Sequence, residues 1–476
     1  MASWTRIAKV VRARRAWVPA VVCSIVAAIA AAVTGGSIAA SPAAESAANR
    51  SSRSIAKSIR AAAHRIEGAD ADYDTLLRRI GDARIVLLGE DTHGTREFYI
   101  ERARITQRLI DQHGFSAVVI EGDWSEAAGL RAILTGNVAA SDIDHSLRAF
   151  RRFPGWMWAN TDFRDFLLWL RSWNARRPPD AEPVVVHGMD LYDIQGSIEV
   201  VLRFLEPVNP DAAVRARADY ACLETSGAAT GTAVGARWPD IDCSSSAQQV
   251  LTTVASGVDG VAGSAPDNGV YIDALQNARI AANGEAYARA MHHGSEHAWD
   301  LRDRHMASTI DLLLAHLDAV SGHRSRVVVW AHNAHVGDAA ATSRGEAGFI
   351  TIGQLLRERY PGDTVSVGFI TATGDVRAAH VWGGADRVMR LTPPLRHTHA
   401  ALLRQAGVRR FYLVLDAMRP LPALLERPRL QRGIGVRYVK KLEIEGGHYY
   451  RARLGRQFDA LVFIDRTHAL RPLRGR

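Results

Sequence analysis

The stretch Arg84-Ile85-Val86-Leu87-Leu88-Gly89-Glu90-Asp91-Thr92-His93 joins a short apolar run to a cluster of polar and titratable side chains. Runs of Val, Ile and Leu without strict alternation are typical of strands that are covered on both faces, as in parallel sheets. Ligands of parallel sheets bind at the carboxyl ends of the strands. The stretch therefore predicts a buried strand with functional groups directly after it.

Six further apolar runs of this kind follow, at Ala117–Ile120, Pro183–Val186, Arg326–Trp330, Thr364–Ile370, Phe411–Leu415 and Ala460–Ile464. Apolar residues at helical spacing occur between them, at Glu97–His113, Phe163–Asn174 and Leu301–Leu317. Strands that alternate with helices indicate βαβ units. The predicted fold class is α/β, with a mainly parallel β-sheet domain flanked by helices.

The middle of the chain has a different composition. Helical patterns at about 196–220 and 270–293 flank a stretch from Cys222 to about Asn268 that is rich in Ser, Gly, Ala and Thr. We interpret that stretch as a loop or insertion, because it contains few large apolar residues. The sequence thus predicts a mostly helical insertion at about 196–300, within a domain that covers residues 41–476.

Residues 1–40 have the pattern of a targeting segment. They contain five cations (Arg6, Lys9, Arg12, Arg14 and Arg15) and no acid, and an apolar run from Ala16 to about Val33 precedes small residues. This pattern predicts a signal peptide that is cleaved near Ala40, and hence a secreted or cell-envelope protein. The pair Arg14-Arg15 loosely resembles a twin-arginine signal. The alternative is an uncleaved membrane anchor, because about 18 apolar residues can just span a bilayer.

Removal of this segment changes both the number of cysteines and the net charge of the chain. Cys222 and Cys243 remain, and in an exported protein such a pair predicts a disulfide, the alternative being two reduced, buried thiols. The full chain has a net charge of +9, whereas the part from residue 41 has 54 cations and 50 acids, and therefore +4. So small an excess, interleaved with acids, predicts no nucleic-acid partner.

Titratable side chains follow four of the predicted strands, and parallel strands would bring them to one face of the sheet. They are Glu90, Asp91 and His93; Glu121 and Asp123; His187, Asp190 and Asp193; and His332, His335 and Asp338. His93 is the strongest candidate for a general base, because an imidazole titrates near pH 6.5 and a nearby Glu90 or Glu121 would fix its tautomer. A helix-capping or core histidine is the alternative.

His332 and His335 lie three residues apart, without the His-Glu-x-x-His pattern of zinc proteases. Oxyanion donation, substrate binding, metal ligation and a simple surface location all remain open for them. Arg102 lies nine residues after His93 and could reach back to a carboxylate or an oxyanion, or lie on the surface. The chain has no Gly-x-Ser-x-Gly elbow and no phosphate- or dinucleotide-binding glycine motif. Water activated by a base, with or without a metal, is the remaining chemistry.

Several motifs resemble the erythromycin esterase family, which includes succinoglycan biosynthesis homologues. The resemblance covers about residues 75–473 and is carried by the segments 88–98, 114–124, 188–192, 302–306, 328–338 and 458–473. It implies a large parallel α/β domain with a helical lobe and a cleft between them. It also implies that His93 activates water for attack on an ester carbonyl, with Glu90 and Glu121 as accompanying acids. The matched Arg102, Arg302, His332 and His335 would bind the substrate or the oxyanion.

The expected function is therefore hydrolysis of carboxylic esters or lactones, small molecules such as macrolides, without a serine nucleophile and without a cofactor. Two alternatives remain. One is a metal-dependent hydrolase in which His93, His332, His335 and a glutamate bind a divalent metal. The other is an exported envelope- or polysaccharide-associated protein with little esterase activity. The sequence predicts contact with a membrane only if the N-terminal segment is not cleaved.

Overall fold

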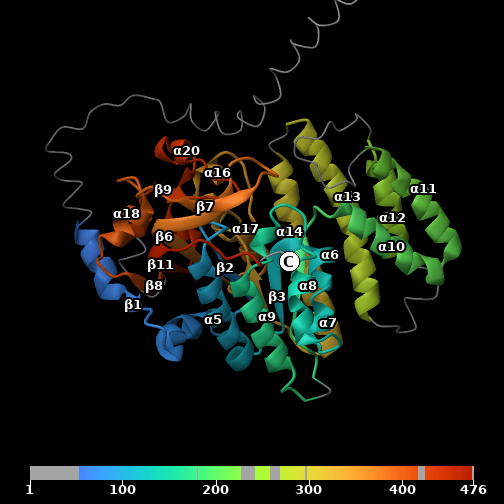
Figure 1. Ribbon diagram of the computed structural model, residues 1–476, viewed down its shortest axis with the longest axis horizontal. Coiled ribbons are helices and arrows are strands. Elements are labelled where there is room, and N and C mark those ends of the chain that lie inside the picture. Colours follow the sequence, from blue (N-terminus) through green and yellow to red (C-terminus); the bar gives the residue numbers. More distant parts are fainter. Residues whose placement is uncertain are drawn as a thin grey trace, which may run out of the picture.

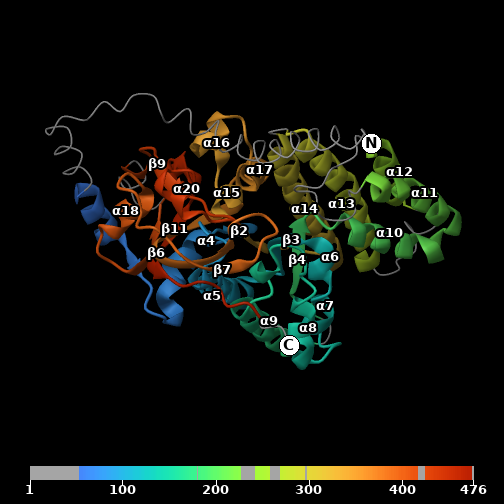
Figure 2. The same cartoon turned by 45° about the horizontal axis from the view of Figure 1, so that its top comes forward.

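The computed structural model describes residues 53–178, 181–226, 242–257, 268–294, 297–415 and 424–473. The predicted signal peptide at 1–40 lies outside these residues, so its cleavage and the predicted export stay predictions. Within the described ranges, no helix combines the length and the apolar character that crossing a membrane requires. Figures 1 and 2 show the arrangement of the elements from two directions.

A nine-stranded sheet forms the centre of the described chain. Its neighbouring strands β11 (Ala460–Thr467), β6 (Thr364–Ala379), β2 (Ile85–Leu88), β5 (Val327–Trp330), β3 (Ala117–Asp123) and β4 (Val185–Asp190) are all parallel. At one edge, β8 (Arg410–Val414) pairs antiparallel with β11, and β1 (His64–Arg65) pairs antiparallel with β8; β7 (Asp386–Arg390) pairs antiparallel with β6. The predicted fold class, a mainly parallel α/β sheet flanked by helices, is confirmed.

All seven apolar runs form strands. The short strands β1, β7, β9 (Arg429–Arg432) and β10 (Tyr449–Ala452) were not predicted, because charged residues interrupt them and several of their side chains are exposed. Strand β4 also extends beyond its apolar run to Asp190, so His187 lies inside a strand and not after it. Asp190, and Glu121 and Asp123 at the end of β3, likewise belong to the strands, so the prediction that these residues and His187 follow the strand ends is wrong.

Alternating strand residues pack into two separate apolar cores, one on each face of the sheet. Val86 and Leu88 face α4 (Asp74–Ile80), α5 (Arg96–His113) and α9 (Thr161–Asn174). Ile85 and Leu87 face the helix at 53–62, α14 (His297–Ser321), α17 (Ile352–Arg359) and α18 (His399–Arg404). Coverage on both faces explains why these strands are apolar throughout.

Four helices lie side by side at one end of the molecule, to the right in Figure 1 and in the turned view of Figure 2. They are α10 (Ile194–Val208), α11 (Pro210–Ser226), α12 (Ser244–Ala255) and α13 (Asn268–His292), and they have an apolar core of their own. A disulfide joins Cys222 to Cys243, as predicted. Helix α12 lies in the stretch that the sequence predicts as a loop, and this prediction is wrong for 244–255.

The helix α12 escapes a composition-based prediction because small polar residues fill most of its positions. Its buried residues are Ala247, Val250 and Val254, which recur at the spacing of one helical face. Helix packing in this lobe thus depends on a narrow apolar stripe and not on overall hydrophobicity.

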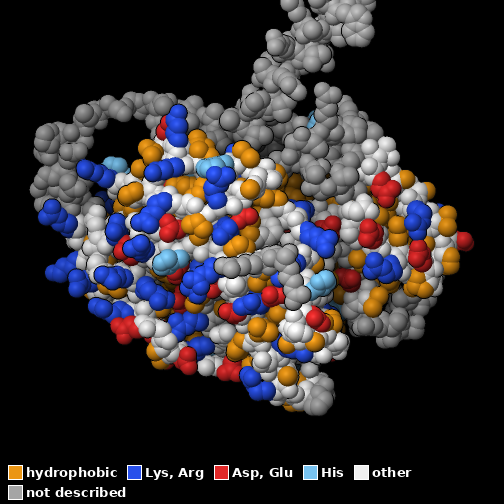
Figure 3. Space-filling model, in the orientation of Figure 1, with side chains coloured by type: hydrophobic (Ala, Val, Ile, Leu, Met, Phe, Trp, Pro, Cys, Tyr) orange, Lys and Arg blue, Asp and Glu red, His pale blue; other side chains and the backbone are white. Residues whose placement is uncertain are grey.

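Side chains of both signs are mixed over the helical lobe on the face seen in Figure 3, and basic side chains are more frequent over the left part of that face. The predicted lack of a nucleic-acid partner is not tested by this distribution and stays a prediction.

Candidate active site

The loop between β2 and α5 carries the first group of candidate residues, and two glycines let it pack closely. A Cβ atom on Gly89 would lie 2.0 Å from the side-chain oxygen of Asn333, and one on Gly94 would lie 1.8 Å from the carbonyl oxygen of Arg377. The backbone N–H of His93 donates to the carbonyl of Ile434 over 3.1 Å. The loop is therefore fixed between the sheet and the segment after β9.

His93 is buried and lies between two carboxylates. Its Nδ1 is 2.8 Å from Oε1 of Glu90, and its Nε2 is 3.9 Å from Oε1 of Glu121. An ionised carboxylate only accepts hydrogen bonds, so Nδ1 donates to Glu90. The lone pair of neutral His93 is then on Nε2, which is the nitrogen that a general base needs to be free.

Arg102 holds the other oxygen of Glu90. Its Nη2 donates to Oε2 over 2.9 Å, and its guanidinium lies over the rings of Tyr99 and Trp330 at 4.4 and 5.0 Å from their centroids. Arg102 is fully buried and is not part of the lining of the adjacent cavity. It reaches back from α5 to a carboxylate, which is one of the three possibilities that the sequence left open for Arg102.

Arg302, on α14, binds two carboxylates that come from neighbouring strands. It donates to Oδ1 and Oδ2 of Asp190 over 2.9 and 2.6 Å, and to Oε1 of Glu121 over 2.8 Å. The second oxygen of Glu121 accepts from the backbone N–H of His332 over 2.8 Å. Glu121 at the end of β3 therefore links α14 to the loop after β5.

His335 is held in place by α14 on both sides of its ring. Its Nδ1 lies 2.9 Å from Oδ2 of Asp303, and its Nε2 lies 2.9 Å from Nη1 of Arg302. The indole of Trp299 stacks on the imidazole, with ring centroids 4.4 Å apart. Because both ring nitrogens have protein partners, His335 is placed to orient Arg302.

His332 has the opposite hydrogen-bonding state. Its Nδ1 accepts from the backbone N–H of Ala334 over 3.1 Å, so the proton of the neutral ring is on Nε2. That Nε2 is buried and has no partner among the described residues. The rings of His93 and His332 lie 4.9 Å apart. A free acceptor on His93 thus lies near a free donor on His332.

The charges around the site and the burial of its groups shift the pKa values of His93, His332 and Glu121. Burial lowers the pKa of His93, but the charges of Glu121 and Glu90 and the hydrogen bond to Glu90 outweigh it and raise that pKa above 6.5. Burial and the charge of His93 lower the pKa of His332 well below its usual value. Burial opposes ionisation of Glu121, yet His335, His93 and Arg302 lower its pKa strongly. His332 is therefore neutral and Glu121 ionised at neutral pH.

A cavity of about 530 Å³ opens beside these groups. Its lining is mostly apolar and includes His93, Glu121, Arg302, His332, His335, Phe150, Met157, Trp158, Tyr287, Trp299, Arg344 and Trp382. Volumes of this order are typical of small-molecule sites. Helices α13 and α14 and the turn between β6 and β7 all contribute to the lining. The cavity therefore places the His93–His332 pair in reach of a small molecule.

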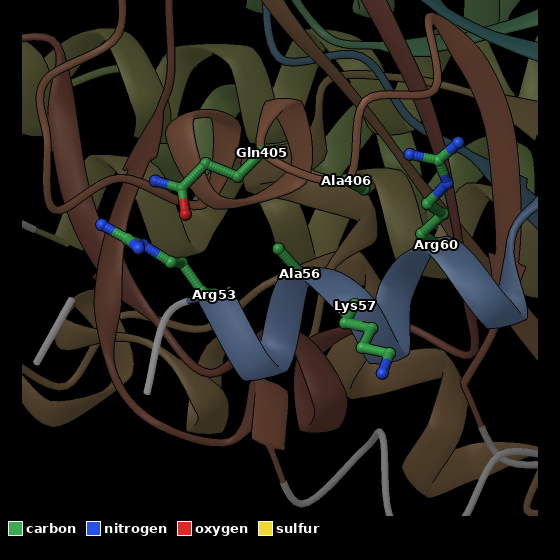
Figure 4. A pocket seen from close by; sticks show the side chains of 6 residues that line it. All are labelled: Arg53, Ala56, Lys57, Arg60, Gln405 and Ala406. Carbon is green, nitrogen blue, oxygen red and sulfur yellow. The ribbon is translucent and has the colours of Figure 1, made fainter. Parts of the chain in front are cut away.

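A second cavity, of about 590 Å³, lies between the helix at 53–62 and the end of α18 (Figure 4). Arg53, Lys57 and Arg60 line it together with Gln405 and Ala406. Among the described residues, no carboxylate or histidine lines it. The polar groups that could perform hydrolysis are in the first cavity.

The described residues do not form a metal site: no three His, Cys, Asp or Glu side chains among them are arranged to bind one ion. The reason is visible in the contacts. The oxygens of Glu121 accept from Arg302 and from the backbone of His332, and Nε2 of His335 faces the cation of Arg302. Because Arg302 already binds Glu121 and lies against Nε2 of His335, these two side chains do not fit as ligands of a metal ion.

The structure brings together all seven residues that the sequence predicts for the site: Glu90, His93, Arg102, Glu121, Arg302, His332 and His335. Asp193 instead caps the N-terminus of α10, and Asp338 caps the short helical turn Ala339–Ala341. Trp299, Arg344 and Tyr287 were not predicted, because they come from helices and short turns and not from strand ends. Their roles were not visible in any motif.

The model of the family described as erythromycin esterase matches residues 110–467. The chain is 24% identical over 330 residues to erythromycin esterase type II of Escherichia coli, covering 65% of this chain and 74% of the relative. It is 23% identical to erythromycin esterase type I of Escherichia coli over 60% of this chain and 70% of the relative.

Solved structures show the same fold. A Bacillus cereus protein has a TM-score of 0.74 at 20% identity, with 89% of this chain and 99% of the other covered. A mutant of the erythromycin esterase EreC in its open conformation has a TM-score of 0.63 at 17% identity, with 84% and 94% covered. Since the family model spans about three quarters of the sequence, the chain belongs to the erythromycin esterase family.

Proposed function

We propose that the protein hydrolyses carboxylic esters or lactones, with His93 as the general base that activates water. The observation that supports this most is the pairing of a free acceptor, Nε2 of His93, with a free donor, Nε2–H of His332, at one wall of the cavity. Family membership supports the same reaction class.

The distance between His93 and Glu121 suits a bridging water molecule, which would act as the nucleophile. Their facing atoms are 3.9 Å apart, too far for a direct hydrogen bond but suitable for a bridging water. Such a water would donate one hydrogen to Nε2 of His93 and the other to Oε1 of Glu121. Its oxygen then attacks the carbonyl carbon while His93 takes the proton.

The later steps use the same groups. Nε2–H of His332 donates to the oxyanion of the tetrahedral intermediate. Glu90, whose second oxygen is fixed by Arg102, stabilises protonated His93. When the intermediate collapses, the C–O bond breaks and His93 returns the proton to the leaving alkoxide. Arg302 and His335 position Glu121 in this scheme.

The first test is the variant His93→Ala, with His323→Ala on the surface as the matched control. We expect the rate with a simple aryl ester or lactone to fall by about 10²–10⁴-fold, because the general base is lost. The thermal transition should stay close to that of the parent, and His323→Ala should keep the parental rate. Hydrolysis by His93→Ala at the parental rate would contradict the assignment.

Two further measurements address the alternatives. Activity that is lost on chelation and restored by Zn²⁺ or Mn²⁺ would favour the metal-dependent hydrolase. Binding to envelope glycans without turnover of any ester or lactone would favour the polysaccharide-associated protein. Macrolide lactones are the first compounds to include, because the relatives are named as erythromycin esterases.

A further inference from the structure

Arg344 lines the active-site cavity with an unused guanidinium. It lies on the short helix α16 (Ser343–Glu346), and its Cζ is 5.0 Å from the ring centroid of Trp299 and 4.9 Å from that of Tyr450. The guanidinium makes no hydrogen bond or ion pair with any residue in the described part of the chain. Stacking on two rings leaves its in-plane N–H donors available.

The remaining charges of the cavity do not neutralise Arg344. Arg302 is compensated by Asp190 and Glu121, and Arg152 donates to Asp123 over 2.6 Å. Glu126 also lines the cavity, but burial and the charge of Asp123 raise its pKa and so reduce its negative charge. Arg437 also lines the cavity and is itself a cation, so the positive charge of Arg344 is not compensated towards whatever enters the cavity.

The aromatic rings around Arg344 also border His335 and His332. Trp299 stacks directly on His335. A Cβ atom on Gly433 would lie 3.1 Å from the ring of Tyr450 and 3.6 Å from Cε1 of His332, so these two rings flank the same glycine. A group bound by Arg344 would therefore lie in the same part of the cavity as His332 and His335.

We propose that Arg344 binds a carboxylate on the substrate, so that the preferred substrates are carboxylic esters with a separate anionic group. This inference rests on the proposed hydrolase function and specifies its substrate class. A guanidinium matches a carboxylate with two parallel N–H···O bonds, and stacking fixes its plane beforehand. Hydrogen bonds to charged groups of this kind change affinity by about 10- to 100-fold.

The test uses a matched pair of substrates, 4-acetoxybenzoate and its methyl ester. The para carboxylate cannot attack its own acetyl group, and dividing kcat/KM by the rate with hydroxide corrects for intrinsic reactivity. The meta isomers vary the reach between the carboxylate and the reacting carbonyl. At pH 7.5 we expect the parent protein to prefer an acid over its methyl ester by about tenfold or more.

Three variants test whether the preference for the acid over its methyl ester depends on Arg344. Arg344→Met should lower the corrected ratio by about 10- to 100-fold while changing the neutral ester much less, and Arg344→Lys should retain part of the ratio. Arg453 pairs with Glu346 on the surface. Arg453→Met is the matched control, because this substitution removes the same charge outside the cavity. It should leave the ratio unchanged. A parent that prefers the methyl esters, or an equal loss for both substrates in Arg344→Met, would overturn the proposal.

Calorimetry with the unreactive amide 4-acetamidobenzoate separates this proposal from the proposed function. If the parent hydrolyses neither ester, the hydrolase assignment fails for these compounds, and binding then decides the role of Arg344. Binding to the parent that weakens about tenfold or more in Arg344→Met, with no binding of the amide's methyl ester, would support the carboxylate site. No binding to the parent, or equal affinity in Arg344→Met, would refute it.

Discussion

At the scale of single residues, the different roles that we propose for His93 and His332 follow from their hydrogen-bond partners. A carboxylate on Nδ1 of His93 makes it a donor there and leaves Nε2 as a base, whereas a backbone N–H on Nδ1 of His332 leaves its Nε2 as a donor. Sequence motifs identify both as histidines after strands. They do not reveal these states, because the partner of His332 is a backbone group two residues away.

The pH dependence should report the state of His93. Its pKa lies above 6.5, and a general base must be unprotonated to act. We therefore expect kcat/KM to rise as the pH increases through the pKa of His93. Glu90→Gln removes an anion beside the imidazolium, which lowers the pKa of His93, and the acidic limb should move to lower pH while kcat falls. Glu67→Gln, at an exposed position, is the control for stopped-flow or steady-state pH profiles. An acidic limb that stays in place in Glu90→Gln would exclude Glu90 as the partner that sets this pKa.

At the scale of elements, the loop between β2 and α5 depends on its contact with β6. The carbonyl of Gly94 accepts from the backbone N–H groups of Arg377 and Leu470, both over 3.0 Å. This packing leaves no space for a side chain at position 94. The position of His93 is thus coupled to a strand nearly 300 residues later in the sequence.

We expect Gly94→Ala to disturb this loop, because its new Cβ would overlap the backbone of Arg377 at 1.8 Å. Backbone cannot move aside as a flexible side chain can, so both the turnover rate and the midpoint of thermal unfolding should fall. Gly129→Ala is the control, since Gly129 has a φ of −61° and its nearest neighbour would be 3.5 Å from the added atom. Parental activity and stability in Gly94→Ala would show that the loop is not held as described.

The sequence predicts the elements with strong apolar patterns and the groups at their ends. The strands β2, β3 and β5 and the site residues Glu90, Glu121 and His332 follow from that logic. Strand β9 does not, because its Gln431 and Arg432 are buried polar residues, and Arg432 donates to the backbone carbonyl of Thr371, 61 residues earlier in the sequence. Arg344 is likewise unpredictable, since its function depends on rings from α14 and β10 that only the fold brings together.

At the scale of the whole molecule, the four-helix lobe is a second packing unit beside the sheet. Its core is separate from the two cores of the sheet, and among the described residues of the lobe, those that line the cavity, Tyr287 and Met291, belong to α13. The disulfide joins α11 to the start of α12, across residues 227–241 that lie outside the described ranges. A bond of this kind is stable in an oxidising compartment, which supports the proposal that the protein is exported.

Replacing both cysteines by serine should destabilise this lobe and leave the site largely intact. The bond closes a separation of 21 residues, which corresponds to about 3 kcal/mol in the loop-entropy model. We expect a lower denaturation midpoint with little change in kcat. Reductant should shift the midpoint of the parent in the same direction and leave the double variant unchanged. A parent midpoint that does not respond to reductant would contradict a stabilising role for this disulfide.

The contacts of Arg302 also bear on how the protein can diversify. One guanidinium serves Asp190, Glu121 and His335, so a single substitution at any of the four positions leaves a buried group without its partner. Such a loss costs about 3–5 kcal/mol, comparable to the whole stability margin of many domains. Mutational paths to new substrates should therefore avoid this set. Arg344 and Trp382 line the cavity, and their side chains contact other described residues through ring packing alone, with no hydrogen bond or ion pair to lose, so they are the positions at which selection or laboratory evolution can act stepwise.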